Sequence, residues 1–129
     1  MMDAGQSLLA GQLDNGWHPL EPGFRWSMGR AGLRLAAPGE ARELSVEAFR
    51  GPEEGKRGRV TLVVLLNGTE AARWVMEKEN SSLAVSTALP ASLDRTKPVV
   101  VELLITPVLR EEGPGGRQLG LAFGRIGFR

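Results

Sequence analysis

The chain has 129 residues, which suits one compact domain with a sizeable core. It has no cysteine, and this excludes disulfides, thiolate nucleophiles, iron–sulfur clusters and cysteine-based zinc sites. Sixteen basic and fifteen acidic side chains give a net charge of +1. The two signs alternate along the chain and never form the concentrated basic face that nucleic acid requires, so we expect no nucleic-acid partner.

The first 15 residues are predicted to be an N-terminal extension, either disordered or a short helix, ahead of a β-sandwich domain at 16–129. Asp3 stands where a signal peptide carries positive charge, and the apolar run at 8–10 is too short for a signal core. No segment approaches the ~20 apolar residues of a membrane span. We therefore predict a cytoplasmic protein that has no membrane span.

The stretch GWHPLEPGFRW, residues 16–26, holds two of the three tryptophans and the only histidine. Trp17 lies in a loop, whereas Trp26 is in phase with the apolar residues of the segment that follows. That segment, 24–37, is interrupted by glycines and predicts two short strands or one bent strand.

The middle of the chain predicts a run of antiparallel strands. Apolar and polar residues alternate in 41–49, as in a strand with one face in water. The next strand, 58–66, is apolar on both faces, and Asn67-Gly68 after it is a strong signal for a type I′ hairpin turn. The returning strand, 69–78, places Trp74 on its apolar face.

Three further strands are predicted at 82–89, 99–106 and 118–129. The Pro-bounded segment 89–98 is expected to be a crossover loop, and 107–118 to be the longest polar loop. In the last strand the apolar residues change phase near Gly124, which predicts a β-bulge.

Together these elements predict an all-β fold: a single antiparallel β-sandwich, jelly-roll-like, with seven or eight strands. Glycine and proline interrupt the chain every 8–12 residues or so, which is typical of short strands in a sandwich. Packing two antiparallel sheets face to face is the simplest way to bury so many half-apolar strands.

The sequence offers little for catalysis. One histidine is too few for the metal site of a cupin, and no Gly-x-Ser-x-Gly elbow accompanies it. The adjacent pairs Glu53-Glu54 and Glu111-Glu112 lie in Gly/Pro-rich loops, where carboxylates are usually solvated. We therefore expect no catalytic residue, no metal and no cofactor.

Two interpretations of Trp17 remain open. An exposed indole flanked by charged side chains is a platform on which a sugar ring can stack, and His18, Glu21 and Arg25 are close in sequence. Alternatively, Trp17 closes one end of the sandwich as an apolar plug. For Trp26 and Trp74 the strand phase favours core packing.

The order GWHPLE, FRW, LRLAAP, ARELSVEA, LNG, LAVSTALP, VELLITP and RQLGLAFGRIGF resembles ancillary β-sandwich domains that accompany some bacterial glycosyltransferases and methyltransferases, and is similar to carbohydrate-binding modules. The resemblance spans residues 16–128 and implies no catalytic activity. The motif positions are Trp17, Glu21, Arg25, Trp26, Arg117, Leu119 and Gly120. Glu21 and Arg117 precede the first and last strands, and we predict that they form a charge-assisted contact.

The leading hypothesis is a non-catalytic accessory module that binds carbohydrate or a glycoconjugate and works beside a glycosyltransferase chain. Its candidate ligand-binding residues are Trp17, His18, Glu21, Arg25 and Arg117. The alternative is a structural or protein-interaction domain, for example a homodimer joined through an exposed sheet face. That face would carry Val63, Leu65, Val100 and Leu104.

Overall fold

A computed structural model describes residues 2–3, 13–19, 21–50, 57–111 and 116–129. The described residues form eleven strands and no helix, so the predicted all-β class is confirmed. The predicted number of seven or eight strands is too low, because four of the eleven strands span only two residues each. The strands are β1 (Met2–Asp3), β2 (Arg25–Trp26), β3 (Arg30–Leu35), β4 (Glu43–Phe49), β5 (Val60–Leu66), β6 (Thr69–Met76), β7 (Ser82–Ala88), β8 (Val99–Thr106), β9 (Leu109–Arg110), β10 (Gln118–Leu119) and β11 (Ala122–Phe128).

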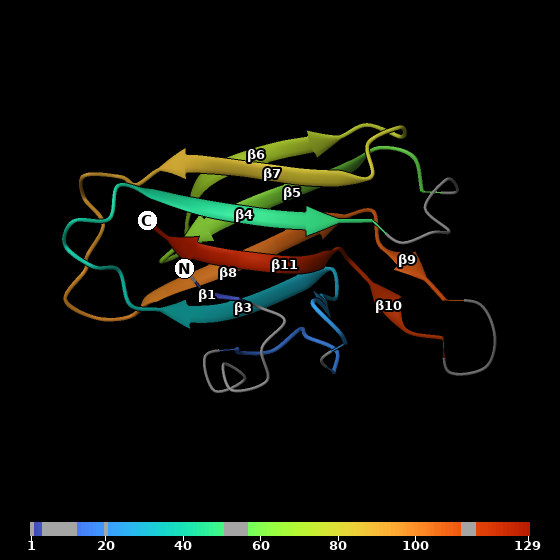
Figure 1. Cartoon of the computed structure of the whole chain (residues 1–129), viewed down its shortest axis with the longest axis horizontal. Coiled ribbons are helices and arrows are strands. Elements are labelled where there is room, and N and C mark those ends of the chain that lie inside the picture. The colour runs from blue at the N-terminus through green and yellow to red at the C-terminus, as the bar shows by residue number, and fades with distance from the viewer. Residues whose placement is uncertain (1, 4–12, 20, 51–56, 112–115) are drawn as a thin grey trace.

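Two antiparallel sheets stack face to face (Figure 1). Sheet A has the order β1-β11-β4-β7, with β2 also pairing with β11, and sheet B has the order β3-β8-β5-β6. The pairs are nested: β2 with β11, β3 with β8, β4 with β7 and β5 with β6. One long hairpin rolled over on itself gives this pattern, so the predicted jelly-roll-like sandwich is confirmed.

The turn at the tip of that rolled hairpin is the predicted one. Asn67 has φ 48° and Gly68 has φ 86°, as a type I′ turn requires of both central residues. On β6, Met76 is fully buried while Arg73 points to solvent, in agreement with the predicted phase. The predicted bulge in β11 is also present, since the pairing with β4 shifts between Phe123 and Arg125.

Two parts of the chain differ from the prediction. The expected loop at 107–118 contains a short hairpin, β9 with β10, whose two-residue strands are too brief to produce a periodic signal. The described ends of the N-terminal extension belong to the sandwich, because β1 pairs with β11 and Leu13 pairs with Leu33. The remainder of the extension, 4–12, and the carboxylates Glu53, Glu54 and Glu112 lie outside the described residues.

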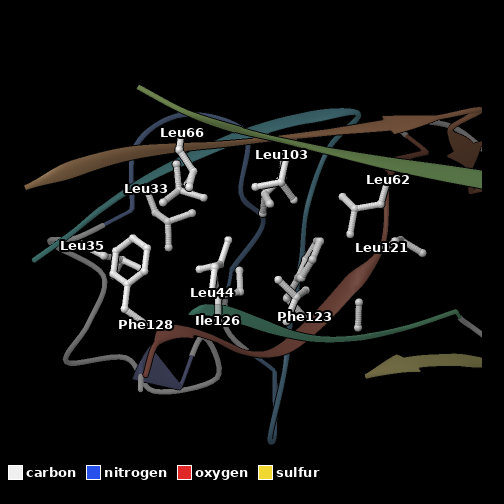
Figure 2. Packing of buried hydrophobic residues seen from close by; sticks show 14 of the residues in the cluster. Leu33, Leu35, Leu44, Leu62, Leu66, Leu103, Leu121, Phe123, Ile126 and Phe128 are labelled. Atoms are coloured by element: carbon white, nitrogen blue, oxygen red, sulfur yellow. The ribbon is translucent and has the colours of Figure 1, made fainter. Parts of the chain in front are cut away.

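The core fills the space between the sheets (Figure 2). Alternate residues of each strand point inward, so leucines of sheet B meet phenylalanine and isoleucine side chains of sheet A. The largest fully buried side chains are Phe123, Leu33, Leu44, Leu62, Met76, Leu103, Leu121 and Ile126. A smaller cluster, built on Trp26, Leu119 and Ala122, lies at the end of the sandwich near β9 and β10.

Arginines tie the loops at the ends of the sheets. The guanidinium groups of Arg50, Arg57 and Arg95 each donate to two or more backbone carbonyls from other parts of the chain. Arg50 donates to the carbonyls of Gly58 and Glu77. Arg57 donates to those of Pro107, Leu119 and Gly120. Arg95 donates to those of Pro38, Gly39 and Ala41. Each guanidinium therefore links backbone carbonyls at the ends of different strands.

Candidate functional site

Residues 13–19 and 21–24, which we call the closing segment, run along the side of the sandwich where β3 and β11 lie. The Asp14 amide donates to the Gly32 carbonyl at 2.8 Å, and the Gly32 amide donates to the Asn15 carbonyl at 3.0 Å. Gly16, at φ +96°, then turns the chain so closely over β3 that a Cβ atom would lie 2.7 Å from the Ala31 Cα. Only glycine fits at this turn.

Trp17 lies across the gap between the two sheets. Its ring meets Phe123 of β11 edge to face, with centroids 5.7 Å apart, and its Nε1–H donates to the Gly32 carbonyl of β3 at 2.8 Å. The half-buried indole packs against the main core. With its only donor bonded inside the protein, Trp17 has the contacts of a plug and lacks those of a free platform.

His18 and Arg25 are also bonded internally. Both are buried, each with about 8% of its surface exposed. His18 Nε2 lies 2.6 Å from the Gln118 carbonyl, which makes Nε2–H the donor, and Arg25 Nη1 donates to the His18 carbonyl at 3.0 Å. These bonds join the closing segment to β10 and hold it in place.

Arg117 forms its ion pair with Glu111 and not with Glu21. Two bonds, at 2.5 and 3.2 Å, link its guanidinium to both Glu111 oxygens. This bonding lowers the pKa of Glu111 and raises the pKa of Arg117. Glu21 acts at longer range, where its charge also raises the pKa of Arg117. One of its carboxylate oxygens is buried and has no hydrogen-bond partner among the described residues.

The five candidate ligand-binding residues therefore divide into two groups. Trp17 points into the gap between the sheets, whereas His18, Glu21 and Arg117 gather near the β9–β10 hairpin, and Arg25 braces the backbone. Neighbouring residues of an extended segment point to opposite sides, which explains the separation of Trp17 from His18. The predicted core packing also holds in part: Trp26 is buried in the smaller cluster, and Trp74 is half-buried against the main core.

Open grooves lie elsewhere, on the outer face of sheet A. Two adjoining grooves of about 260 and 430 Å³ share Glu47, Ala84 and Arg125 in their linings. The first is also lined by Ser45, Val46, Val85, Ser86 and Arg129, and the second by Gly23, Ala48, Phe49, Ser82, Leu83 and Gly124. We call the two together the sheet A groove.

The sheet A groove exists because the outward side chains at its floor are small. Along β7, Ser82, Ala84 and Ser86 all face outward, and Ser45 lies opposite Ser86 on β4. Longer side chains form the rim, where Arg125 lies 3.7 Å from Glu47. Sequence reasoning missed this site, although the period-two run of Ser and Ala on one face of 82–88 was the signal for it.

The outer face of sheet B differs from the predicted apolar face. Val63 is only 7% exposed and Val100 is 37% exposed, while Leu65 and Leu104 are half-buried. Arg30 and Arg34 of β3 lie on the same face, opposite Leu104 and Val100 of β8. A third groove, of about 300 Å³, is lined by Asp14, Asn15, Arg30, Ala31, Gly32, Val100 and Glu102, and within it Arg30 pairs with Glu102.

In the described part of the chain, no three His, Cys, Asp or Glu side chains gather closely enough to hold a metal ion. The same residues include no helix long and apolar enough to cross a membrane. No known family model and no curated protein matches the chain. The resemblance to glycosyltransferase-associated domains thus stays a prediction, and the site must be judged on its geometry.

Proposed function

We propose that the chain is a non-catalytic β-sandwich module that binds carbohydrate along the sheet A groove. The observation that carries this proposal is the pair of adjoining grooves over β4, β7 and β11, which share Glu47, Ala84 and Arg125 in their linings. Their volumes, about 260 and 430 Å³, are close to those of small-molecule sites.

The chemistry of the lining supports a polyhydroxylated ligand. The small, exposed side chains of Ser82, Ala84 and Ser86 let a sugar ring approach the sheet closely. At the rim, Glu47 accepts and Arg125 donates hydrogen bonds, which suits neighbouring hydroxyl groups. Phe49, half-buried at one end, offers an apolar ring edge.

The same lining supports a binding role without catalysis. Among the residues that line the groove, Glu47 is the one carboxylate, and it already faces Arg125. Hydrolysis of a glycosidic bond requires two carboxyl groups on opposite sides of the bond. The groove therefore contains hydrogen-bonding groups for recognition and no acid–base pair.

A glycan array probed with the purified chain tests this proposal. We expect binding to at least one glycan, with affinity about tenfold weaker in Arg125→Ala because a charge-assisted hydrogen bond is lost. Arg34→Ala is the matched control: Arg34 is also exposed, its side chain 65% accessible against 62% for Arg125, but it lies on sheet B.

A second candidate, a protein-interaction domain, is favoured by the inward position of Trp17, because this removes the expected sugar platform. The array separates the two candidates. Absence of binding to every glycan at millimolar concentration, or equal loss in Arg125→Ala and Arg34→Ala, would reject carbohydrate binding in the sheet A groove.

A further inference from the structure

Each sheet of the sandwich has two edges, and three of these four edges are protected in the described part of the chain. The β11 edge of sheet A is covered by β1 and β2. The β3 edge of sheet B is covered by the backbone of residues 13–15. The β6 edge carries a bulge near Glu70, an exposed Glu70–Arg73 ion pair, and a bond from the Thr87 hydroxyl to the Ala71 carbonyl.

The fourth edge, β7, has no covering strand, bulge or charged side chain among the described residues, and the bond from its Thr87 hydroxyl to Ala71 does not use its backbone groups. Its sequence, SLAVSTA, contains no charge, no proline and no glycine. It pairs with β4 in unbroken register from Ser82–Phe49 to Ala88–Glu43, so no bulge twists it away. All seven of its residues keep some exposure to solvent. An edge of this kind leaves backbone N–H and C=O groups free to pair with another strand.

We propose that this edge pairs with β7 of a second copy of the chain, antiparallel and centred on Val85. About that centre the sequence matches itself: Val85 faces Val85, and the flanking pairs are Ala84 with Ser86, Leu83 with Thr87 and Ser82 with Ala88. Small side chains meet small ones on the outer face, and no charge opposes another. A two-fold axis perpendicular to the sheet produces this register.

Partly exposed apolar side chains favour the same partner. Leu83 and Val85 on β7, and Trp74 on the neighbouring β6, pack against the core but remain half-exposed. A second copy placed at this edge would bring a second Leu83 and Val85 beside them and extend the core across the interface. Burial of this surface would stabilise the dimer in addition to the backbone hydrogen bonds.

The dimer would also have a consequence for binding. Sheet A would become continuous, with the order β11-β4-β7-β7-β4-β11, and both sheet A grooves would open on the same side. A ligand long enough to reach both grooves would gain affinity from their linkage. The dimer itself does not depend on the proposed function, because it rests on the edge strand alone.

Paired charges test the register. In the double variant Ala84→Lys with Ser86→Lys, like charges face each other twice across the interface, and we expect the dimer to dissociate at least about tenfold more readily. In Ala84→Lys with Ser86→Glu, opposite charges face each other at the same two positions, and we expect dimerisation at least as strong as in the wild type. Analytical ultracentrifugation measures the mass, and circular dichroism verifies that both variants are folded.

A disulfide provides a second test, since the chain has no thiol of its own. In the proposed register Val85→Cys lies opposite its own copy, within reach of a disulfide, and mild oxidation should give a covalent dimer. Ser82→Cys is the control, because six residues along the pairing separate it from its copy by roughly 20 Å. A wild type that stays monomeric at millimolar concentration would overturn the proposal, as would a dimer that persists in the like-charge variant. These readouts are independent of glycan binding.

Discussion

Where β3 and β11 form one side of the sandwich, the closing segment lays backbone and an indole over the gap between the sheets. On the opposite side β6 and β7 lie next to each other (Figure 1). Among the described residues, half-exposed side chains such as Trp74 and Leu83 border the gap there. Trp17 on the first side donates a hydrogen bond to β3 and contacts β11, so it joins the two sheets.

The difference shows what each kind of closure achieves. A chain segment that lies along an edge strand hydrogen-bonds to the amides of that strand and also covers its apolar side chains. Side chains alone cover apolar residues but leave the amides unpaired. The side of β3 and β11 therefore contributes mainly to stability. The side of β6 and β7 keeps hydrogen-bonding capacity that another strand can use.

Gly16→Ala should cause the largest loss of stability on the side of the sandwich where β3 and β11 lie. Its backbone has φ +96°, and the added Cβ would collide with the backbone of Arg30 and Ala31, so we expect a loss of about 4 kcal/mol or more. Gly23→Ala is the matched control, since φ is +80° but no atom lies within 4 Å, and it should cost only about 1 kcal/mol. Urea unfolding measures both; similar losses would contradict the close approach at Gly16.

Substitution of Trp17 on one side and of Trp74 on the other compares how much each side contributes to stability. Trp17→Ala should cost about 3 kcal/mol, because it removes packing on Phe123 and the bond to the Gly32 carbonyl. Trp74→Ala should cost about 1.5 kcal/mol, since the structure gives Trp74 apolar packing only and leaves it half-exposed. If chemical denaturation finds Trp74 to be the more important residue, the closed side does not dominate stability.

The Glu111–Arg117 pair should have the smallest effect on stability, and its contribution should be lost only under acid conditions. Arg117 holds the pKa of Glu111 below its ordinary value of 4.5, so the stabilising contribution is present above that value and is lost as the pH falls through the lower, folded-state pKa. In Arg117→Gln the pKa of Glu111 should return toward 4.5, as NMR titration of its carboxyl carbon would detect. Arg110→Gln is the control: Arg110 is next to Glu111 in the sequence, but its guanidinium donates to the Gly116 carbonyl, so this variant should leave the pKa of Glu111 unchanged.

The long strands were predictable because their inward residues repeat every second position. In β8, for example, Val99, Val101, Leu103 and Ile105 are all buried, as their spacing predicts. The turn at Asn67 and the bulge near Gly124 were predictable from residues that tolerate unusual backbone geometry.

The candidate site was less predictable because contacts between distant residues decide it. Sequence placed Glu21 and Arg117 before the first and last strands, but the short hairpin of β9 and β10 brings Glu111 closer to Arg117. The sheet A groove depends on the register between Ser45 and Ser86, which are 41 positions apart. Periodicity within a strand says nothing of such pairings.

The hydrogen bonds from arginine side chains to backbone carbonyls restrict the two partners to different degrees. The donor must be the arginine, whereas the acceptor belongs to the backbone. Arg57 and Arg95 donate to backbone carbonyls, a group that every residue type supplies. The exposed residues 38–40, where Pro38 and Gly39 accept bonds from Arg95, can therefore be exchanged without losing an acceptor. Gly120 is different, because a Cβ atom there would lie 2.3 Å from the Met28 carbonyl oxygen. A library that randomises the exposed residues 38–40 should thus yield more folded members than one that randomises Arg95 alone.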